Sequence, residues 1–422
     1  MVKKFSKIGV CMVFVLSMIL PQAAVSKAKT ANPYTGKKYV YCSNYKDGIE
    51  LYGKDGSKKK KYTLIKKEYS MREIYKTKSY IYYYKVNRKD SSTGYVWQVP
   101  LNQKSGKLKV KKKKKLFYVN EWREFLYATD KKIVYRINNS IVSYNKKTKQ
   151  KTSLTGKPVY YSSINVAKDA SGLTAKIGNC IYYSRFKSYY KKIDEAFYQL
   201  NLSTGKRKKI VNKASQYESK RYRYDEHEKL DTQVGISGKK LYVPTEKWIV
   251  CYDMAKKKKT NLISMDVLMQ CVKEKFSTDA FHSMHIDKFY FIGNTMYLQL
   301  AVDYQYKIGA YQEISYDRNY VVSLNKKSGK SITYEEELSS FLKNYGNGYN
   351  DGNQCGMHNW TVRTGMILDV TQNGTWIGEF VNEKGKLFYY SYNKNTKVTK
   401  LYSSKKAKVR LMQQGLNDEA YV

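Results

Sequence analysis

The stretch FYQLNLSTGKRKKI, residues 197–210, shows the pattern on which the whole chain is built. Apolar and polar residues alternate as far as Leu200, which is typical of a half-buried strand. Asn201 and Gly205 then enclose a short polar segment, and both residue types favour tight turns. Basic residues and Ile210 follow as the start of a second strand. The stretch is therefore expected to form a β-hairpin.

Seven related hairpins recur along the chain, at separations of 43 to 72 residues. The residues that open their turns are Gly53, Asn102, Asn145, Asn201, Asp253, Asn325 and Asn393. A Tyr-rich strand such as SYIYYYKV precedes each copy, and in the shortest unit EFLYAT, IVYRI, IVSY and KTSL give four strands. Repeats of this kind are typical of propeller blades. The sequence predicts an all-β fold, a single seven-bladed β-propeller of four-stranded antiparallel blades over residues 27–422.

The ends and insertions of the repeat lead to further predictions. The first unit lacks an obvious leading strand, so residues 407–413 are expected to supply its innermost strand and close the ring; the alternative is a frayed tail. Long inserts are expected at 212–229, 264–280, 303–319 and 333–359. Those at 264–280 and 333–359 are expected to contain small helices, the second with a capping box from Thr333 to Glu336.

Residues 1–26 have the composition of a secretory signal peptide, with three lysines before a short apolar segment. No later stretch is apolar enough to span a bilayer. The formal charge is +44, and removal of the signal with its three lysines and no acids leaves +41. A protein this basic attracts anionic polymers. For an exported chain, which is expected to be extracellular or associated with the cell wall, we expect wall polymer or glycan, possibly a protein, in preference to nucleic acid.

The strand-rich repeats resemble those of secreted β-propeller proteins of Gram-positive bacteria, whose blades are similar to the low-density-lipoprotein-receptor type. The segments IYYY, IVYR and IYYS stand where that family has a Tyr-Trp-Thr-Asp strand, and none matches it. The resemblance implies the fold and no particular ligand.

The lysines of the repeats are expected to form a positive rim on one face, near the turns between third and fourth strands. The alternative is a solvated surface that only prevents edge-to-edge aggregation. The rim residues are Lys58, Lys59, Lys60, Lys111, Lys112, Lys206, Arg207, Lys208, Lys256, Lys257, Lys326 and Lys327.

The inserts are expected on the opposite face, where aromatic residues would contact a sugar or a peptide. Tyrosine is unusually frequent, with 44 copies, and suits strands whose rings pack while their hydroxyls reach water. The candidate ligand-binding residues are Tyr222, Tyr224, His227, Tyr304, Tyr306, Tyr311, Tyr316, His358 and Trp360.

Two classes of function are compatible with these features. The first is an exported, non-catalytic binding or scaffold propeller with no cofactor. The second is a metal-dependent polysaccharide lyase or hydrolase for acidic sugars, which needs His282 or His285 to approach His227 or His358. No catalytic motif is present, and His282 and His285 would lie on opposite faces of a strand. The cysteines have no metal-binding spacing, and only Cys271 with Cys355 suggests a pair.

Overall fold

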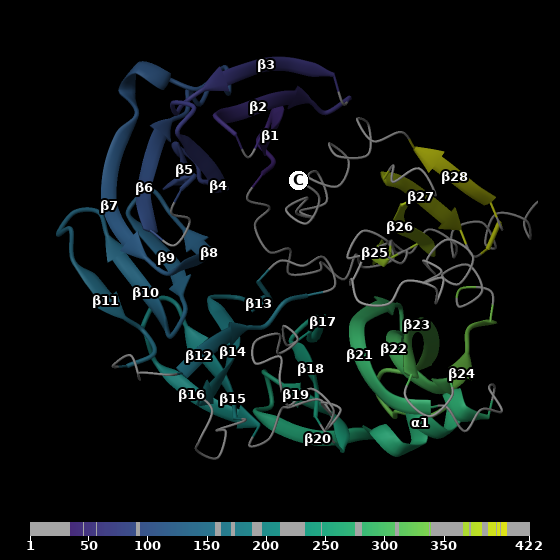
Figure 1. The fold of residues 1–422 in the computed structure, drawn as a ribbon. Helices are drawn as coiled ribbons and strands as arrows, with labels where there is room; N and C mark the ends of the chain where they lie inside the picture. The colour runs from purple at the N-terminus through teal and green to yellow at the C-terminus, as the bar shows by residue number, and fades with distance from the viewer. Residues whose placement is uncertain are drawn as a thin grey trace, which may run out of the picture.

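A computed structural model describes residues 34–44, 46–55, 57–89, 93–156, 162–169, 174–187, 196–211, 233–245, 247–274, 281–308, 312–336, 338, 366–370, 373–381, 387–393, 395–396 and 398–402. Within these residues, seven antiparallel sheets stand around a ring in chain order, with their first strands innermost and their last strands outermost (Figure 1). The predicted seven-bladed β-propeller is confirmed.

The strands are named blade by blade. Blade 1 contains β1 (Tyr39–Ser43), β2 (Gly48–Gly53) and β3 (Lys58–Thr63); blade 2 contains β4 (Tyr69–Lys76), β5 (Tyr80–Asn87), β6 (Thr93–Pro100) and β7 (Lys114–Asn120). Blade 3 contains β8 (Trp122–Ala128), β9 (Lys132–Ile137), β10 (Ser140–Asn145) and β11 (Lys151–Ser153). Blade 4 contains β12 (Ser162–Val166), β13 (Lys176–Ile177), β14 (Cys180–Lys187), β15 (Phe197–Asn201) and β16 (Arg207–Val211). Blade 5 contains β17 (Gly235–Ser237), β18 (Lys240–Pro244), β19 (Trp248–Asp253) and β20 (Lys258–Ser264). Blade 6 contains β21 (Phe281–Ile292), β22 (Thr295–Ile308), β23 (Gln312–Asn325) and β24 (Thr333–Tyr334); blade 7 contains β25 (Met366–Val370), β26 (Thr375–Val381), β27 (Leu387–Asn393) and β28 (Val398–Tyr402).

Two blades depart from the simple four-stranded pattern. Blade 1 has three strands among the described residues, and the segment 407–413 that was predicted to complete it lies outside them. In blade 4 the innermost position is divided, because β12 and β13 both pair with β14. The other five blades have four strands in sequential order.

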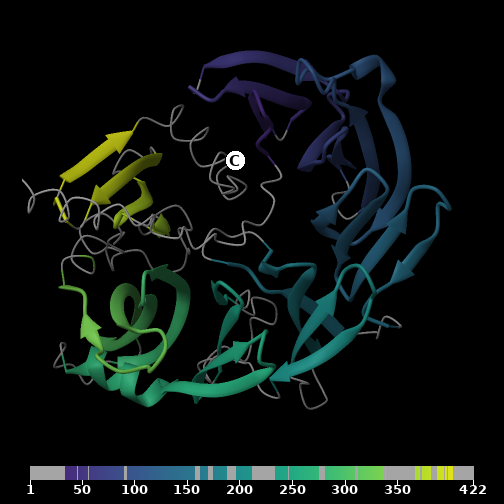
Figure 2. The same cartoon turned by 180° about the vertical axis from the view of Figure 1, so that it is seen from behind.

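The register of the strands gives the ring two different edges, which are seen from opposite sides in Figures 1 and 2. In blade 6, Thr295 at the start of β22 pairs with Asn325 at the end of β23, so the turns β21–β22 and β23–β24 share one end. Ile308 pairs with Gln312 at the other end. We call the end that carries the turns β21–β22 and β23–β24 the turn edge. The opposite end, which also carries the connections between blades, is called the insert edge.

The core is divided into separate clusters between successive blades. Each of six clusters joins two neighbours, from blades 1 and 2 through to blades 6 and 7. Along β5, Ile81 and Tyr83 pack with blade 1, whereas Tyr82 and Tyr84 pack with blade 3. Both faces of such a strand are buried, which explains why YIYYY has almost no polar residue to alternate with the apolar ones.

Buried tyrosines also fasten several blades to their neighbours. The Tyr41 hydroxyl of β1 donates to the Gly106 carbonyl at 2.8 Å, in a turn of blade 2. The Tyr242 hydroxyl of β18 donates to the Lys326 carbonyl at 3.2 Å, in a turn of blade 6. Tyr82 of β5 is fully buried and bonds in the same way to blade 3. The prediction that tyrosine hydroxyls reach water was therefore wrong at these positions, because each hydroxyl donates a hydrogen bond to a backbone carbonyl of the neighbouring blade.

The inserts correspond only in part to the predictions. Helix α1 (Met265–Lys273) forms within 264–280; the Ser264 side chain accepts a hydrogen bond from the Asp266 N–H, and Leu268 is buried. Residues 303–319 were predicted as a loop, but the described ones extend β22 and β23 as a long hairpin. The predicted capping box was also wrong, since Thr333 lies in β24 and pairs with Ser323. Insert 212–229 lies outside the described residues.

Candidate binding surface on the propeller turns

The turn between third and fourth strands has the same construction in six blades. The side-chain oxygen of its first residue accepts the N–H groups two and three residues later, at 2.9 to 3.3 Å. This is the local bonding for which Asn and Asp are favoured in turns. The residues that accept these bonds are Asn102, Asn145, Asn201, Asp253, Asn325 and Asn393. The hairpin signal of the sequence therefore depends on this one side chain.

In the five of these turns whose fifth residue is among the described ones, that residue lies in the left-handed backbone region. Gly205 has φ +70° and Gly329 has φ +68°, a conformation that glycine adopts without strain. Around Gly205, a Cβ would meet only the Leu154 side chain, at 3.7 Å. At Gly329 it would approach the Leu262 carbonyl oxygen to 2.1 Å. The turn of blade 4 is therefore open around its glycine, whereas the corresponding turn of blade 6 packs tightly against blade 5.

Several predicted rim lysines stand exposed at this turn edge. Lys206, Lys256, Lys257 and Lys327 lie in or next to the turns of blades 4, 5 and 6. Lys111 and Lys112 belong to the short 3-10 helix η1 (Val110–Lys112), which stands in the corresponding connection of blade 2. Within the described part of the chain, the ammonium groups of these six lysines have no hydrogen bond or salt bridge. These six lysines are exposed to solvent and form no ion pair with a described residue, although the charge of Lys256 acts on the Asp253 carboxylate of the same turn.

Other predicted rim residues make internal bonds and contribute less to an open surface. Arg207 donates to the Thr155 carbonyl at 2.7 Å, and Lys208 to the Tyr252 hydroxyl at 2.9 Å. Lys326 donates to the Ser237 hydroxyl at 3.0 Å. Burial, followed by the nearby positive charge of Lys327, lowers the pKa of Lys326. These three side chains join one blade to the next.

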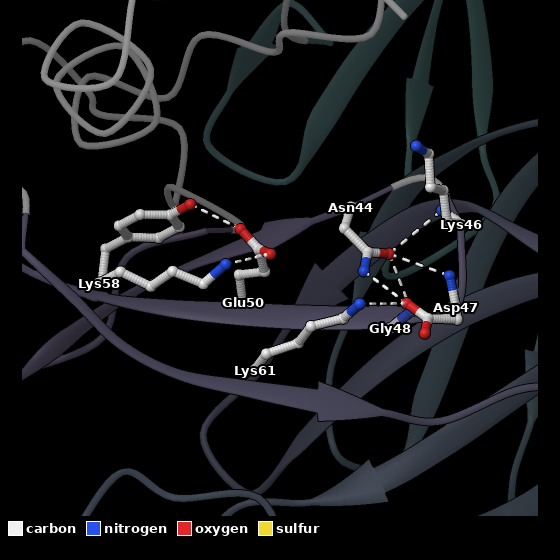
Figure 3. A network of polar contacts seen from close by, with 8 residues as sticks. Asn44, Lys46, Asp47, Gly48, Glu50, Lys58 and Lys61 are labelled. Carbon is white, nitrogen blue, oxygen red and sulfur yellow. Dashed lines mark hydrogen bonds and ion pairs between the residues drawn. The ribbon is translucent and has the colours of Figure 1, made fainter.

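The lysines of blade 1 are largely paired with acids. Lys58 lies 2.6 Å from Glu50 and Lys61 lies 3.1 Å from Asp47 (Figure 3). Lys59 lies 3.9 Å from Asp55. The Lys60 ammonium lies 5.0 Å from the centroid of the Tyr62 ring. Blade 1 therefore carries much of its positive charge in neutralised form, unlike the turns of blades 4 to 6.

Most of the ligand-binding residues predicted for the insert edge lie outside the described residues. Tyr304 and Tyr306 lie in β22 and Tyr316 in β23, and the register pairs Tyr304 with Tyr316. They occupy a β-hairpin and not the expected loop, although their strands bring two of them into direct register. The remaining residues, Tyr222, Tyr224, His227, Tyr311, His358 and Trp360, lie outside the described residues.

The histidines described are both in a strand. His282 and His285 lie in β21, and the His285 Nε2 atom is 2.9 Å from an Asp287 carboxylate oxygen. Among the described residues there is no group of three or more His, Cys, Asp or Glu side chains that could hold a metal ion. His227, His358 and Cys355 lie outside these residues, so the proposed metal convergence and the pair with Cys271 remain predictions.

An internal ion cluster on the inner strands was not anticipated. Glu124 of β8 lies 2.8 Å from the Arg136 guanidinium of β9 and also contacts the Lys168 ammonium of blade 4. Burial raises the pKa of Glu124, but the charges of Lys168 and Arg136 more than offset this and lower it overall. The three side chains are between 12 and 15 % exposed. Because the partners are 12 or more residues apart in sequence, local spacing gave no signal for them.

The solved structures that resemble this chain do so only distantly. No family model and no curated protein matches the sequence. Oligopeptidase B from Leishmania major matches with a TM-score of 0.46 and 9 % identity over 88 % of this chain and 48 % of that one. TolB from Acinetobacter baumannii matches with a TM-score of 0.29 and 11 % identity over 70 % and 62 %. A chain of the nidogen–laminin complex matches with a TM-score of 0.32 and 9 % identity over 75 % and 92 %.

The chain spans about half the length of the peptidase that it matches. The structural neighbours include β-propeller proteins, and at this level of identity the similarity concerns the fold alone. No helix in the described part of the chain is long and apolar enough to cross a bilayer.

Proposed function

We propose that the protein is an exported, non-catalytic binding propeller that contacts an anionic cell-wall polymer or glycan through the lysines of its turn edge. The observation that carries the proposal is the repeated turn, which presents exposed lysines without a salt bridge to a described residue in blades 3, 4 and 6. The insert edge would hold a second ligand, through aromatic residues such as Tyr304 and Tyr316.

The physical basis is charge spacing on a rigid frame. Side chain and backbone hydrogen bonds hold each turn, so the lysines are presented without ordering a loop on binding. At physiological salt the Debye length is about 8 Å, so each ammonium group acts on the polymer segment directly beside it. A long polyanion can contact several turns at once, and each contact adds to the local concentration of the next. Such binding needs no pocket.

The test is a charge variant with a matched control. Lys147→Gln/Lys206→Gln/Lys327→Gln removes one exposed charge from each of three turns. Lys46→Gln/Lys67→Gln/Lys247→Gln removes three exposed charges from the connections of the insert edge. Binding to teichoic acid, dextran sulfate and polyphosphate would be measured at two salt concentrations.

The turn-edge variant should bind the polyanions about tenfold more weakly at low salt and depend less on salt, because it makes fewer ion contacts. The control should stay within about twofold of the wild type. Equal losses in the two variants, or binding that added salt does not weaken, would contradict the proposal. No observation in the described residues favours the alternative of a polysaccharide lyase.

A further inference from the structure

Positive side chains gather at the boundary between blades 1 and 2, on β5, on β7 and in the connections beside them. Lys85 of β5 is half-buried there. Burial, followed by the positive charges of Lys113 and Lys66, lowers its pKa, with a smaller contribution from Lys115. Glu68 is the one acid that counteracts them. Four ammonium groups therefore share a small region with a single carboxylate.

Aromatic rings take the place of acids as the partners of two of these cations, Lys85 and Lys115, whereas the Lys113 ammonium donates to the Leu64 carbonyl. The Lys85 ammonium lies 3.7 Å from the centroid of the Tyr69 ring and 5.5 Å from that of Trp97. The Lys115 ammonium lies 4.7 Å from the centroid of the Tyr95 ring. Cation–π contacts stabilise an ammonium group without neutralising its charge. No salt bridge reaches Lys85 or Lys115 within the described residues, so the region keeps its capacity to attract an anion.

Two rings at this boundary are unusually open to solvent. Tyr95 of β6 is 39 % exposed and Tyr118 of the outer strand β7 is 42 % exposed. They are cross-strand partners, and their centroids lie 5.1 Å apart with the ring planes tilted by 59°. The Trp97 indole N–H is buried without a hydrogen-bond partner in the described part of the chain. The cluster thus combines open ring faces with positive charge.

We propose that Tyr95, Tyr118 and the lysines around Lys85 form a binding site for an acidic sugar unit of a glycan. The ring faces would stack on the apolar C–H face of the sugar, and the ammonium groups would bind its carboxylate, sulfate or phosphate group. This site lies apart from the turn edge and rests on the proposed function only for the chemical class of the polymer. The site would let the protein recognise the sugar of a polymer, whereas the lysines of the turn edge recognise only its negative charge.

A single-stranded nucleic acid also combines rings with charge, but the geometry favours the sugar. The tilted tyrosines pack on one another and leave no parallel slot for a flat base. A sugar ring needs only one exposed aromatic face at a time. Nucleic acid is therefore an outcome of the test that would overturn the assignment.

The experiment uses three probes that separate sugar from charge, namely dextran sulfate, unmodified dextran and polyphosphate, with a single-stranded DNA oligonucleotide as a fourth. The stacking variant is Tyr95→Ala/Tyr118→Ala, and the charge variant is Lys115→Gln. The matched control is Trp248→Ala, which removes a ring of the same exposed fraction, 39 %, from blade 5. Circular dichroism checks the fold, and Tyr118→Ala alone carries the same expectation if the double variant is perturbed.

The stacking variant should bind dextran sulfate about tenfold more weakly, since one stacking contact contributes on the order of a tenfold change. Its binding to polyphosphate should change by less than about twofold. Lys115→Gln should weaken both polyanions, and Trp248→Ala neither. Unchanged binding of dextran sulfate by the tyrosine variants, or tighter binding of the oligonucleotide than of dextran sulfate, would overturn this inference. If the turn-edge variant still loses polyphosphate in that case, the proposed function survives; if the wild type binds no polyanion, both fail.

Discussion

The Tyr82 hydroxyl offers a direct test of how the blades are joined. It donates to the Thr129 carbonyl at 2.8 Å and accepts from the Lys146 ammonium at 3.0 Å, so one oxygen links β5 of blade 2 to two turns of blade 3. Tyr82→Phe removes this oxygen and keeps the buried ring. We expect a loss of stability with no change of fold.

The size of the loss follows from the two bonds. A neutral hydrogen bond contributes about 1 kcal/mol net, and one from a charged donor contributes somewhat more. Lys146 is half-exposed and can recover water as a partner, so its share should be small. The variant leaves no cavity, because the ring still packs in the core between blades 2 and 3. The free energy of unfolding should therefore fall by about 1–2 kcal/mol.

The neighbouring residue Tyr80 supplies the control. Its ring lies 6.1 Å from that of Tyr82 and 3.9 Å from the Lys146 ammonium, but its hydroxyl has no hydrogen bond in the described part of the chain. Tyr80→Phe should change stability by less than about 0.5 kcal/mol. Urea unfolding of both variants, read by circular dichroism, makes the comparison. Equal effects of the two substitutions, or a Tyr82→Phe variant as stable as the wild type, would refute the fastening role.

Three further substitutions test local geometry and charge. Gly329→Ala should destabilise the protein more than Gly205→Ala in urea unfolding, because both incur about 1 kcal/mol for the backbone angle but only the first collides with a carbonyl; equal losses would contradict this reading. Glu124→Gln should lower the free energy of unfolding by about 3 kcal/mol at pH 7, since it leaves Lys168 and Arg136 without their buried partner. The pKa of Glu124 is lowered in the folded state, so its contribution is fully present above the unfolded pKa near 4.3 and is lost as pH falls from there through the lower folded pKa. Stability of the variant should accordingly vary less than that of the wild type between about pH 5 and pH 3, and a parallel pH profile would count against the ion cluster.

The architecture could be predicted from sequence because its signals are local. A turn such as that at Asn201 is specified within a few residues, and seven such signals at blade-sized intervals define a propeller. The hairpin formed by β22 and β23 was missed for the opposite reason. Its residues are polar and strand-forming at once, and only the pairing of distant partners, such as Tyr304 with Tyr316, distinguishes a long hairpin from a loop.

The candidate sites were less accessible to sequence reasoning. The rim lysines could be counted, but their partners could not, since Lys58 with Glu50 and Lys206 without an acid look alike in the sequence. The cluster around Lys85 joins residues from four separate segments at a boundary between blades. No spacing rule describes contacts that arise only when two blades pack together.

The repeated turn explains how so much positive charge can be carried without harm to the fold. In each turn the side chain of the first Asn or Asp and the backbone make structural bonds, and in several turns a Ser or Thr three positions later accepts a further N–H. The side chain two positions after the Asn, by contrast, makes no hydrogen bond with a described residue in blades 3 and 6. A lysine at such a position, for example Lys147 or Lys327, costs little in stability. Charge could therefore accumulate at this edge independently in every blade. The lysines of blade 1 are largely paired with acids, whereas several lysines in the turns of blades 4 to 6 are exposed without a salt bridge. A polyanion should therefore bind the turns of blades 4 to 6 in preference to blade 1.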